Sequence, residues 1–112
     1  MNNIPSDCFQ IIRNYSGYTI EQLYEDSGIS EATIKRYFYD QTKKRYKKST
    51  IIDFLLFTNC PYNVSIHMLE VCKCKLNISN KTDMLYNSIL ENRWFYDYKD
   101  NIKYMKEKTK KL

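Results

Sequence analysis

Few side chains in this sequence have the types and spacing that metal binding or catalysis requires. Cys72 and Cys74 are the nearest to a metal-binding pair, but one residue separates them instead of two to four, and no second pair or paired histidine accompanies them. His67 is the only histidine, and no serine and acid complete a catalytic set around it. No glycine-rich phosphate loop is present. We therefore expect no enzyme activity, no metal and no cofactor.

Positive charge is the stronger chemical signal. The chain of 112 residues has a net charge of +5. The segment Lys43–Lys48 places five positive charges in six residues, and residues 103–112 hold five lysines against one glutamate. A basic chain suits a polyanionic partner. Nucleic acid is favoured over a membrane surface because no long apolar or amphipathic anchor accompanies the charge.

No part of the sequence resembles a membrane span or a signal peptide. No stretch approaches the roughly 20 apolar residues that cross a bilayer, and the N-terminus has neither a basic start nor an apolar core. These features predict a cytoplasmic protein without a membrane partner. We then expect the four cysteines to be reduced thiols and mostly buried, namely Cys8, Cys60, Cys72 and Cys74.

The elements that position these residues are expected to be helices. Ile, Leu, Lys, Glu and Tyr dominate, and only two Gly and two Pro occur. Apolar residues recur at helical spacing, with Tyr15 expected on the buried side of the first helix and Met84 on that of the sixth. The pattern predicts an all-α, compact bundle of about seven short helices in one domain, residues 1–112. The expected helices cover residues 5–16, 20–27, 31–39, 49–57, 65–75 and 82–92, with a last one from about residue 97.

The second and third of these helices have clear boundary signals. Thr19 is an expected N-cap, and Gln22 completes a capping box with it. Gly28 ends the second helix because glycine reaches positive φ without steric cost. Ser30 caps the third helix, on which Ile34 faces inward. The same helix turns a small and polar face towards solvent or a ligand, made of Glu31, Ala32, Thr33, Lys35 and Arg36.

This stretch is similar to the helix-turn-helix of phage-repressor and Cro-type proteins, the Xre family. The resemblance is carried by Thr19, Leu23, Gly28, Ile29, Ser30 and Ile34. It continues through "STIIDFLLFTNCPYNVSIHMLEVCKCKL" and "DMLYNSILENRWFYDYKDNIKYM", which look like the remaining helices of Xre-type regulators of low-G+C bacteria and their mobile elements. It implies a lambda-repressor-like core at about residues 5–76, followed by extra C-terminal helices at about residues 80–108.

The resemblance implies a sequence-specific regulator of transcription, a repressor or an activator, that binds double-stranded DNA as a homodimer. The third helix would enter the major groove. Arg36 is the best candidate for reading a base, since its guanidinium can pair with guanine O6 and N7. The expected base-reading residues are Glu31, Ala32, Thr33 and Arg36, of which Thr33 also suits phosphate. The expected phosphate contacts are Thr19, Ser30, Lys35, Lys43, Lys44, Arg45, Lys47 and Lys48.

Each of these roles has an alternative. Arg36 could pair with Glu31 or Asp40 on the helix surface, and the lysine-rich segment could be a solvated loop. The lysines of the C-terminal tail have no neighbouring motif, so we interpret them as solvated or as a source of non-specific attraction.

The aromatic cluster of residues 93–100, "RWFYDYKD", suggests core packing and a subunit contact rather than a stacking platform. We expect Trp94, Phe95 and Ile102 to contribute to the dimer. A competing hypothesis is a mobile-element protein that uses the same fold to bind and inhibit a host or defence protein. Ile20, Tyr24 and the abundance of tyrosine, a residue favoured at interfaces, support it.

Overall fold

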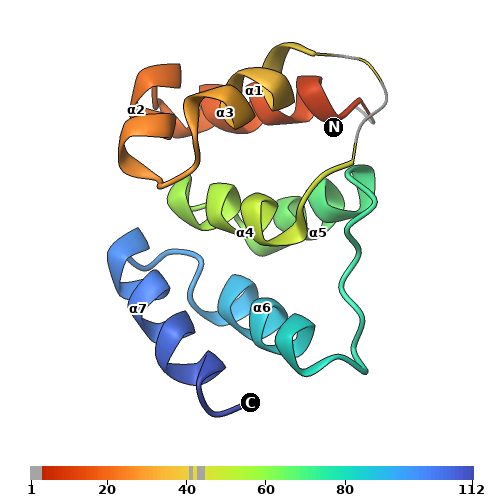
Figure 1. Cartoon of the computed structure of the whole chain (residues 1–112), viewed down its shortest axis with the longest axis vertical. Coiled ribbons are helices and arrows are strands. Elements are labelled where there is room, and N and C mark those ends of the chain that lie inside the picture. Colours follow the sequence, from red (N-terminus) through yellow and green to blue (C-terminus); the bar gives the residue numbers. More distant parts are fainter. Residues whose placement is uncertain (1–3, 41, 43–44) are drawn as a thin grey trace.

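A computed structural model of the chain describes residues 4–40, 42 and 45–112, and in these residues it contains helices and no strand. The all-α prediction is therefore confirmed. Figure 1 shows three tiers, with α1, α2 and α3 in the upper one, α4 and α5 in the middle, and α6 and α7 in the lower one. The helices in chain order are α1 (Pro5–Ser16), α2 (Ile20–Asp26), α3 (Glu31–Tyr39), α4 (Lys48–Phe57), α5 (Tyr62–Val71), α6 (Lys81–Asn92) and α7 (Tyr98–Thr109).

Local sequence signals account for several of the helix ends. Gly17 ends α1 at φ +81°, in the left-handed region. The capping box of α2 is complete, because the Gln22 N–H donates to Thr19 Oγ1 at 3.1 Å and the Thr19 N–H donates to Gln22 Oε1 at 2.8 Å. Asn80 caps α6 and Asp97 caps α7 through side-chain oxygens.

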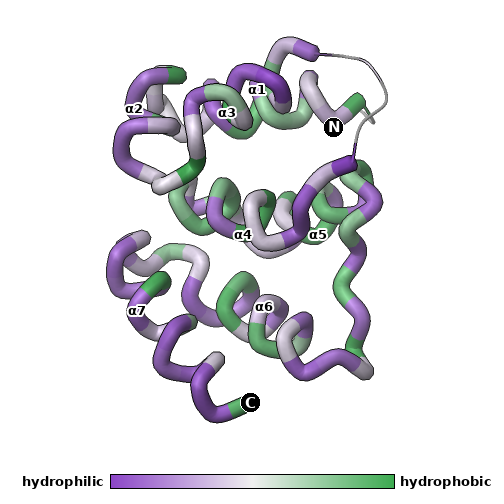
Figure 2. Tube along the Cα trace, in the orientation of Figure 1, coloured by the Kyte–Doolittle hydropathy of each residue, from purple (hydrophilic) through white to green (hydrophobic). Residues whose placement is uncertain are grey.

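The middle tier supplies much of the core. α4 is buried over most of its circumference, as its nearly continuous apolar sequence predicts, and in Figure 2 its green segments lie between the upper and lower tiers. Its Phe54 meets Phe9 of α1 edge to face, with 5.1 Å between ring centroids. Phe9 also packs against the rings of Tyr37, Phe38 and Tyr46. This aromatic cluster joins α1, α3 and the segment before α4 to the central helix.

Polar contacts fix α7 against the rest of the molecule. The Tyr98 hydroxyl donates to the Ser27 carbonyl at 2.6 Å, across 71 residues of sequence. Asn101 is fully buried and bonds Arg93 twice: its Nδ2 donates to the Arg93 carbonyl at 2.8 Å, and its Oδ1 accepts from Arg93 Nε at 3.1 Å. None of the helices in the described residues is long and apolar enough to cross a membrane.

The expected bounds of the fifth helix were wrong at both ends. α5 begins at Tyr62 instead of Ser65, because Pro61 fits the position before a helix and Asn63 continues the helix instead of the turn. It ends at Val71 because Lys73 enters the left-handed region at φ 59°, which lets the Cys74 N–H reach the Leu69 carbonyl at 2.8 Å.

Two residues expected in the core are exposed. Tyr15 has 93% of its surface accessible, since at 100° per residue it lies about 120° around α1 from Phe9, beyond the buried face. Met84 is 57% accessible because Ile89 and Leu90 set the buried side of α6 and Met84 lies away from it. Helical spacing alone does not predict whether an apolar residue at the edge of the buried face is covered by a neighbouring helix.

Candidate nucleic-acid interface

α2 and α3 are short helices joined by a four-residue turn, Ser27–Ser30, whose geometry its own residues fix. Gly28 has φ +82°, and the Ile29 N–H donates to Ser27 Oγ at 3.0 Å. Ile29 is buried and closes the turn from inside. Leu23 of α2 and Ile34 of α3 are buried on the same inner side. The angle between the two helices is thus held by the turn and by a shared apolar contact with the core.

The outer face of α3 carries most of the residues expected to read bases. Glu31, Ala32, Lys35 and Arg36 are exposed, whereas Thr33 is half-buried. Tyr39 joins this face one turn further on and is also exposed; sequence reasoning did not include it, although its spacing from Arg36 and Lys35 places it there. Behind the face, the helix is anchored by three buried side chains: Ile34, Tyr37 and Phe38.

The polar groups of this face interact with one another. Lys35 Nζ lies 2.6 Å from Glu31 Oε2, in an exposed pair one helical turn apart. The hydrogen bond to Glu31 raises the pKa of Lys35 above its ordinary value. Ser30 Oγ accepts the Thr33 N–H at 3.2 Å and donates to Thr33 Oγ1 at 2.9 Å, so both hydroxyls serve the helix cap. The guanidinium of Arg36 lies 5.3 Å from the ring centroid of Tyr37.

The residues expected to contact phosphate are not all placed alike. Arg45 and Lys47 are exposed beside the start of α4. Thr19 is exposed, and its hydroxyl caps α2. Lys43 and Lys44 lie outside the described residues.

Lys48 has a partner within the chain, which the sequence did not indicate. Its Nζ lies 2.7 Å from Asp83 Oδ2 and donates to the Lys75 carbonyl at 3.2 Å. Burial raises the pKa of Asp83, but hydrogen bonds from Lys48 and from the Asn77 N–H outweigh it, so that the net shift lowers the pKa. This pair ties the start of α4 to α6. The Lys48 side chain is thus engaged within the chain, unlike exposed Arg45 and Lys47 of the same basic segment.

Burial shifts the pKa values of two core thiols and of one acid on α4. Burial raises the pKa of Cys60 to about 11 and that of Cys72 to about 12, so both thiols stay protonated at neutral pH. Burial also raises the pKa of Asp53 on α4 to about 6. No group of three or more possible metal ligands occurs in the part of the chain that the structure describes.

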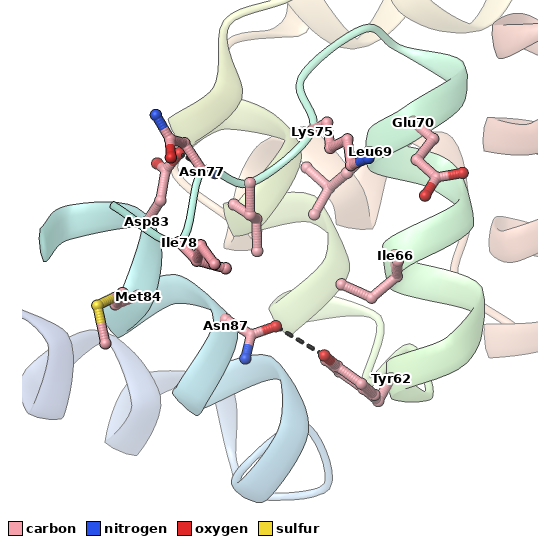
Figure 3. Close-up of a pocket in the computed structure, with 11 residues that line it drawn as sticks. Tyr62, Ile66, Leu69, Glu70, Lys75, Asn77, Ile78, Asp83, Met84 and Asn87 are labelled. Atoms are coloured by element: carbon pink, nitrogen blue, oxygen red, sulfur yellow. Dashed lines mark hydrogen bonds between the residues drawn. The ribbon is translucent and has the colours of Figure 1, made fainter. Parts of the chain in front are cut away.

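A hollow of about 350 Å³ lies between α5, the following loop and α6 (Figure 3). Ile66, Leu69 and Ile78 contribute apolar surface to it. At its edge the Tyr62 hydroxyl donates to Asn87 Oδ1 at 2.7 Å, shown by the dashed line in Figure 3. This bond joins α5 to α6, and Asp83 at the opposite end is held by Lys48, so these polar groups hold the helices together.

A second hollow, which we term the apolar groove, lies between α1, the α4–α5 turn and the α6–α7 connection. It measures about 630 Å³. Exposed Ile11 and Tyr15 of α1 form one side, and Trp94 closes the other. Phe95, next to Trp94, is 61% accessible. Ile102, which was expected to act with these two aromatics, lines a different groove beside the α2–α3 turn.

Comparisons of the chain with protein-family models, with curated proteins and with solved structures find no match.

Proposed function

We propose that the chain is a sequence-specific, double-stranded DNA-binding regulator of transcription that inserts α3 into the major groove. The observation that carries this proposal is the outer face of α3. Its small and polar side chains, Glu31, Ala32 and Arg36, are exposed on a helix whose opposite side is anchored in the core. A helix that enters a groove needs both properties, because base contacts require close approach and a fixed orientation.

The side chains of this face suit separate tasks. Arg36 supplies the paired donors that recognise guanine. The small side chain of Ala32 lets the helix approach the base edges closely. Exposed Arg45 and Lys47 would neutralise phosphates of the DNA backbone beside the groove. Lys35 can exchange Glu31 for a phosphate at small cost, because an exposed ion pair contributes only about 0–1 kcal/mol.

Arg36→Ala is expected to weaken binding to the preferred site by about 1–3 kcal/mol and to relax the preference at one base position. Arg45→Ala is the matched control and should weaken binding to all duplexes alike. The slope of the logarithm of the binding constant against the logarithm of the salt concentration should become shallower by about 0.9, because one phosphate is no longer neutralised. Selection from a random duplex pool at two salt concentrations measures both effects. If the Arg36→Ala protein selects the same site as the parent with the same affinity, the proposal that α3 recognises bases is contradicted.

We also propose that two copies associate through the apolar groove, with Phe95 of each copy entering the groove of the other. The groove and an exposed aromatic side chain occur beside each other on one chain, as an isologous contact requires. Dimerisation would present two α3 helices to two half-sites and double the contact with DNA. Trp94 would form the wall against which the inserted ring packs.

Phe95→Glu should convert a dimer to a monomer, since a carboxylate would have to be buried in an apolar groove. Sedimentation at micromolar concentration measures the change. Met84→Glu, at an exposed residue of α6 that does not line the apolar groove, is the control and should leave the mass unchanged. A parent protein that is a strict monomer and still binds DNA tightly would exclude this dimer.

Binding and inhibition of another protein is the second candidate function, and the exposed aromatic surface beside the apolar groove is the observation that favours it. The pool experiment separates the two functions. Enrichment of one short site supports the regulator, whereas weak and uniform binding that disappears with salt favours the protein-binding function.

A further inference from the structure

Three lysines of α7 and Lys110, the residue directly after it, lie along one side of that helix. Lys99, Lys103, Lys106 and Lys110 are separated by four, three and four residues, the spacing that aligns side chains on a helix. All four are exposed and line an open groove of about 600 Å³. The opposite wall of this groove is formed by residues 26–28, at the turn that leads into α3.

The position of this lysine face relative to α3 is fixed. The Tyr98 hydroxyl holds the Ser27 carbonyl at 2.6 Å, and the Tyr98 ring meets Phe57 of α4 edge to face at 5.2 Å. Buried Asn101 locks the next turn of α7 to Arg93. In Figure 1 the first turn of α7 lies below the α2–α3 turn, and Figure 2 shows α7 as mostly hydrophilic. The lysines are thus presented by an anchored helix and not by a loose tail.

The charge of the lysine face is not balanced within the described residues. None of the four ammonium groups takes part in an ion pair there. The groove contains two acids, Asp26 and Glu107, so four positive charges less two negative ones leave an excess of two. Like charges four residues apart on a helix repel each other, as in the pairs Lys99–Lys103 and Lys106–Lys110. A polyanion lying along the helix would relieve this repulsion.

We propose that the lysine face of α7 contacts the phosphate backbone of the same DNA duplex that α3 reads. This inference rests on the proposed function. Lys99 and Lys110 are eleven residues apart, about 16 Å along the helix at 1.5 Å per residue. One DNA strand carries a phosphate every 3.4 Å or so along its axis, so several phosphates fall within that length. The groove adjoins the turn before α3, so in this proposal one duplex runs along both α3 and the lysine face.

The test compares two triple variants with equal loss of charge. Lys99→Gln, Lys103→Gln and Lys106→Gln together remove three charges from the lysine face. Lys73→Gln, Lys75→Gln and Lys81→Gln remove three exposed charges from the α5–α6 side of the molecule. Binding of each full-length variant to the selected duplex and to an unrelated duplex is measured between about 50 and 200 mM salt, the range over which phosphate contacts change affinity most visibly. Circular dichroism verifies the fold, and single Gln variants replace a triple variant that does not fold.

For the lysine-face variant, the slope of the logarithm of the binding constant against the logarithm of the salt concentration should become shallower by about 1–3 on both duplexes. Each phosphate that is no longer neutralised accounts for about 0.9 of this change. The site preference should stay the same. The control variant should keep the slope of the parent within a few tenths. Equal slopes in the two variants would overturn the inference, even if the parent selects a specific site. If the parent shows no site preference but the lysine-face variant alone loses slope, the phosphate contact stands and the proposed regulator function fails. A parent that binds no duplex overturns both.

Discussion

Replacing Phe9 with alanine should lower the free energy of unfolding by about 3–5 kcal/mol, the largest loss that we expect from any single truncation in the aromatic cluster. Phe9 has 0% of its surface accessible. Its ring lies 5.1–6.1 Å, between centroids, from the rings of Phe54, Tyr37, Phe38 and Tyr46. Removing it leaves a cavity where three elements meet, and surrounding side chains can fill it only in part.

Urea unfolding followed by far-ultraviolet circular dichroism measures the loss. Tyr15→Ala is the matched control on the same helix, because the Tyr15 side chain is almost wholly exposed and its removal should change stability by at most about 0.5 kcal/mol. A Phe9→Ala protein within 1 kcal/mol or so of the parent would contradict a core built around this ring. It would then follow that α1 is not anchored to α4 as the structure places it.

Sequence alone predicted the helices because the signals that start and end them are local. The Thr19–Gln22 capping box, the Ser30 cap and the positive φ of Gly28 each involve residues within a few positions of one another. The near-continuous apolar sequence of α4 likewise identified the central helix. These features place α3 and orient its outer face, so most of the exposed residues of that face could be named in advance.

Contacts between distant parts of the chain could not be predicted in this way. Asp83 lies 35 residues from Lys48, and nothing in the basic segment distinguishes the lysine that Asp83 engages from its exposed neighbours. Helical periodicity does not predict the hydrogen bond from Tyr98 to Ser27 either. That bond fixes the position of the helix that carries the C-terminal lysines, which the sequence suggested were solvated or a source of non-specific attraction. Their spacing is visible in the sequence, but the element they face is not.

A variant of α3 can lose DNA binding either because its buried side no longer packs or because its exposed side no longer contacts DNA. Ile34 has 1% of its surface accessible and lies on the inner side of α3 with Leu23 of α2. Arg36, two residues later, is exposed on the outer side. Truncation of either side chain is expected to lower DNA binding, but for different physical reasons. The two causes can be separated by measuring stability and affinity on the same variants.

Ile34→Ala should lower the free energy of unfolding by about 2–5 kcal/mol, because it opens a cavity between α3 and the core. Lys35→Ala, at the next residue, loses only an exposed ion pair and should stay within about 0.5 kcal/mol of the parent. Urea unfolding gives both values. Below the temperature at which Ile34→Ala begins to unfold, its affinity per folded molecule should approach that of the parent, since Ile34 faces away from the proposed DNA surface. A fully folded Ile34→Ala protein that has lost site preference would contradict this assignment, because the inner side of α3 would then take part in recognition.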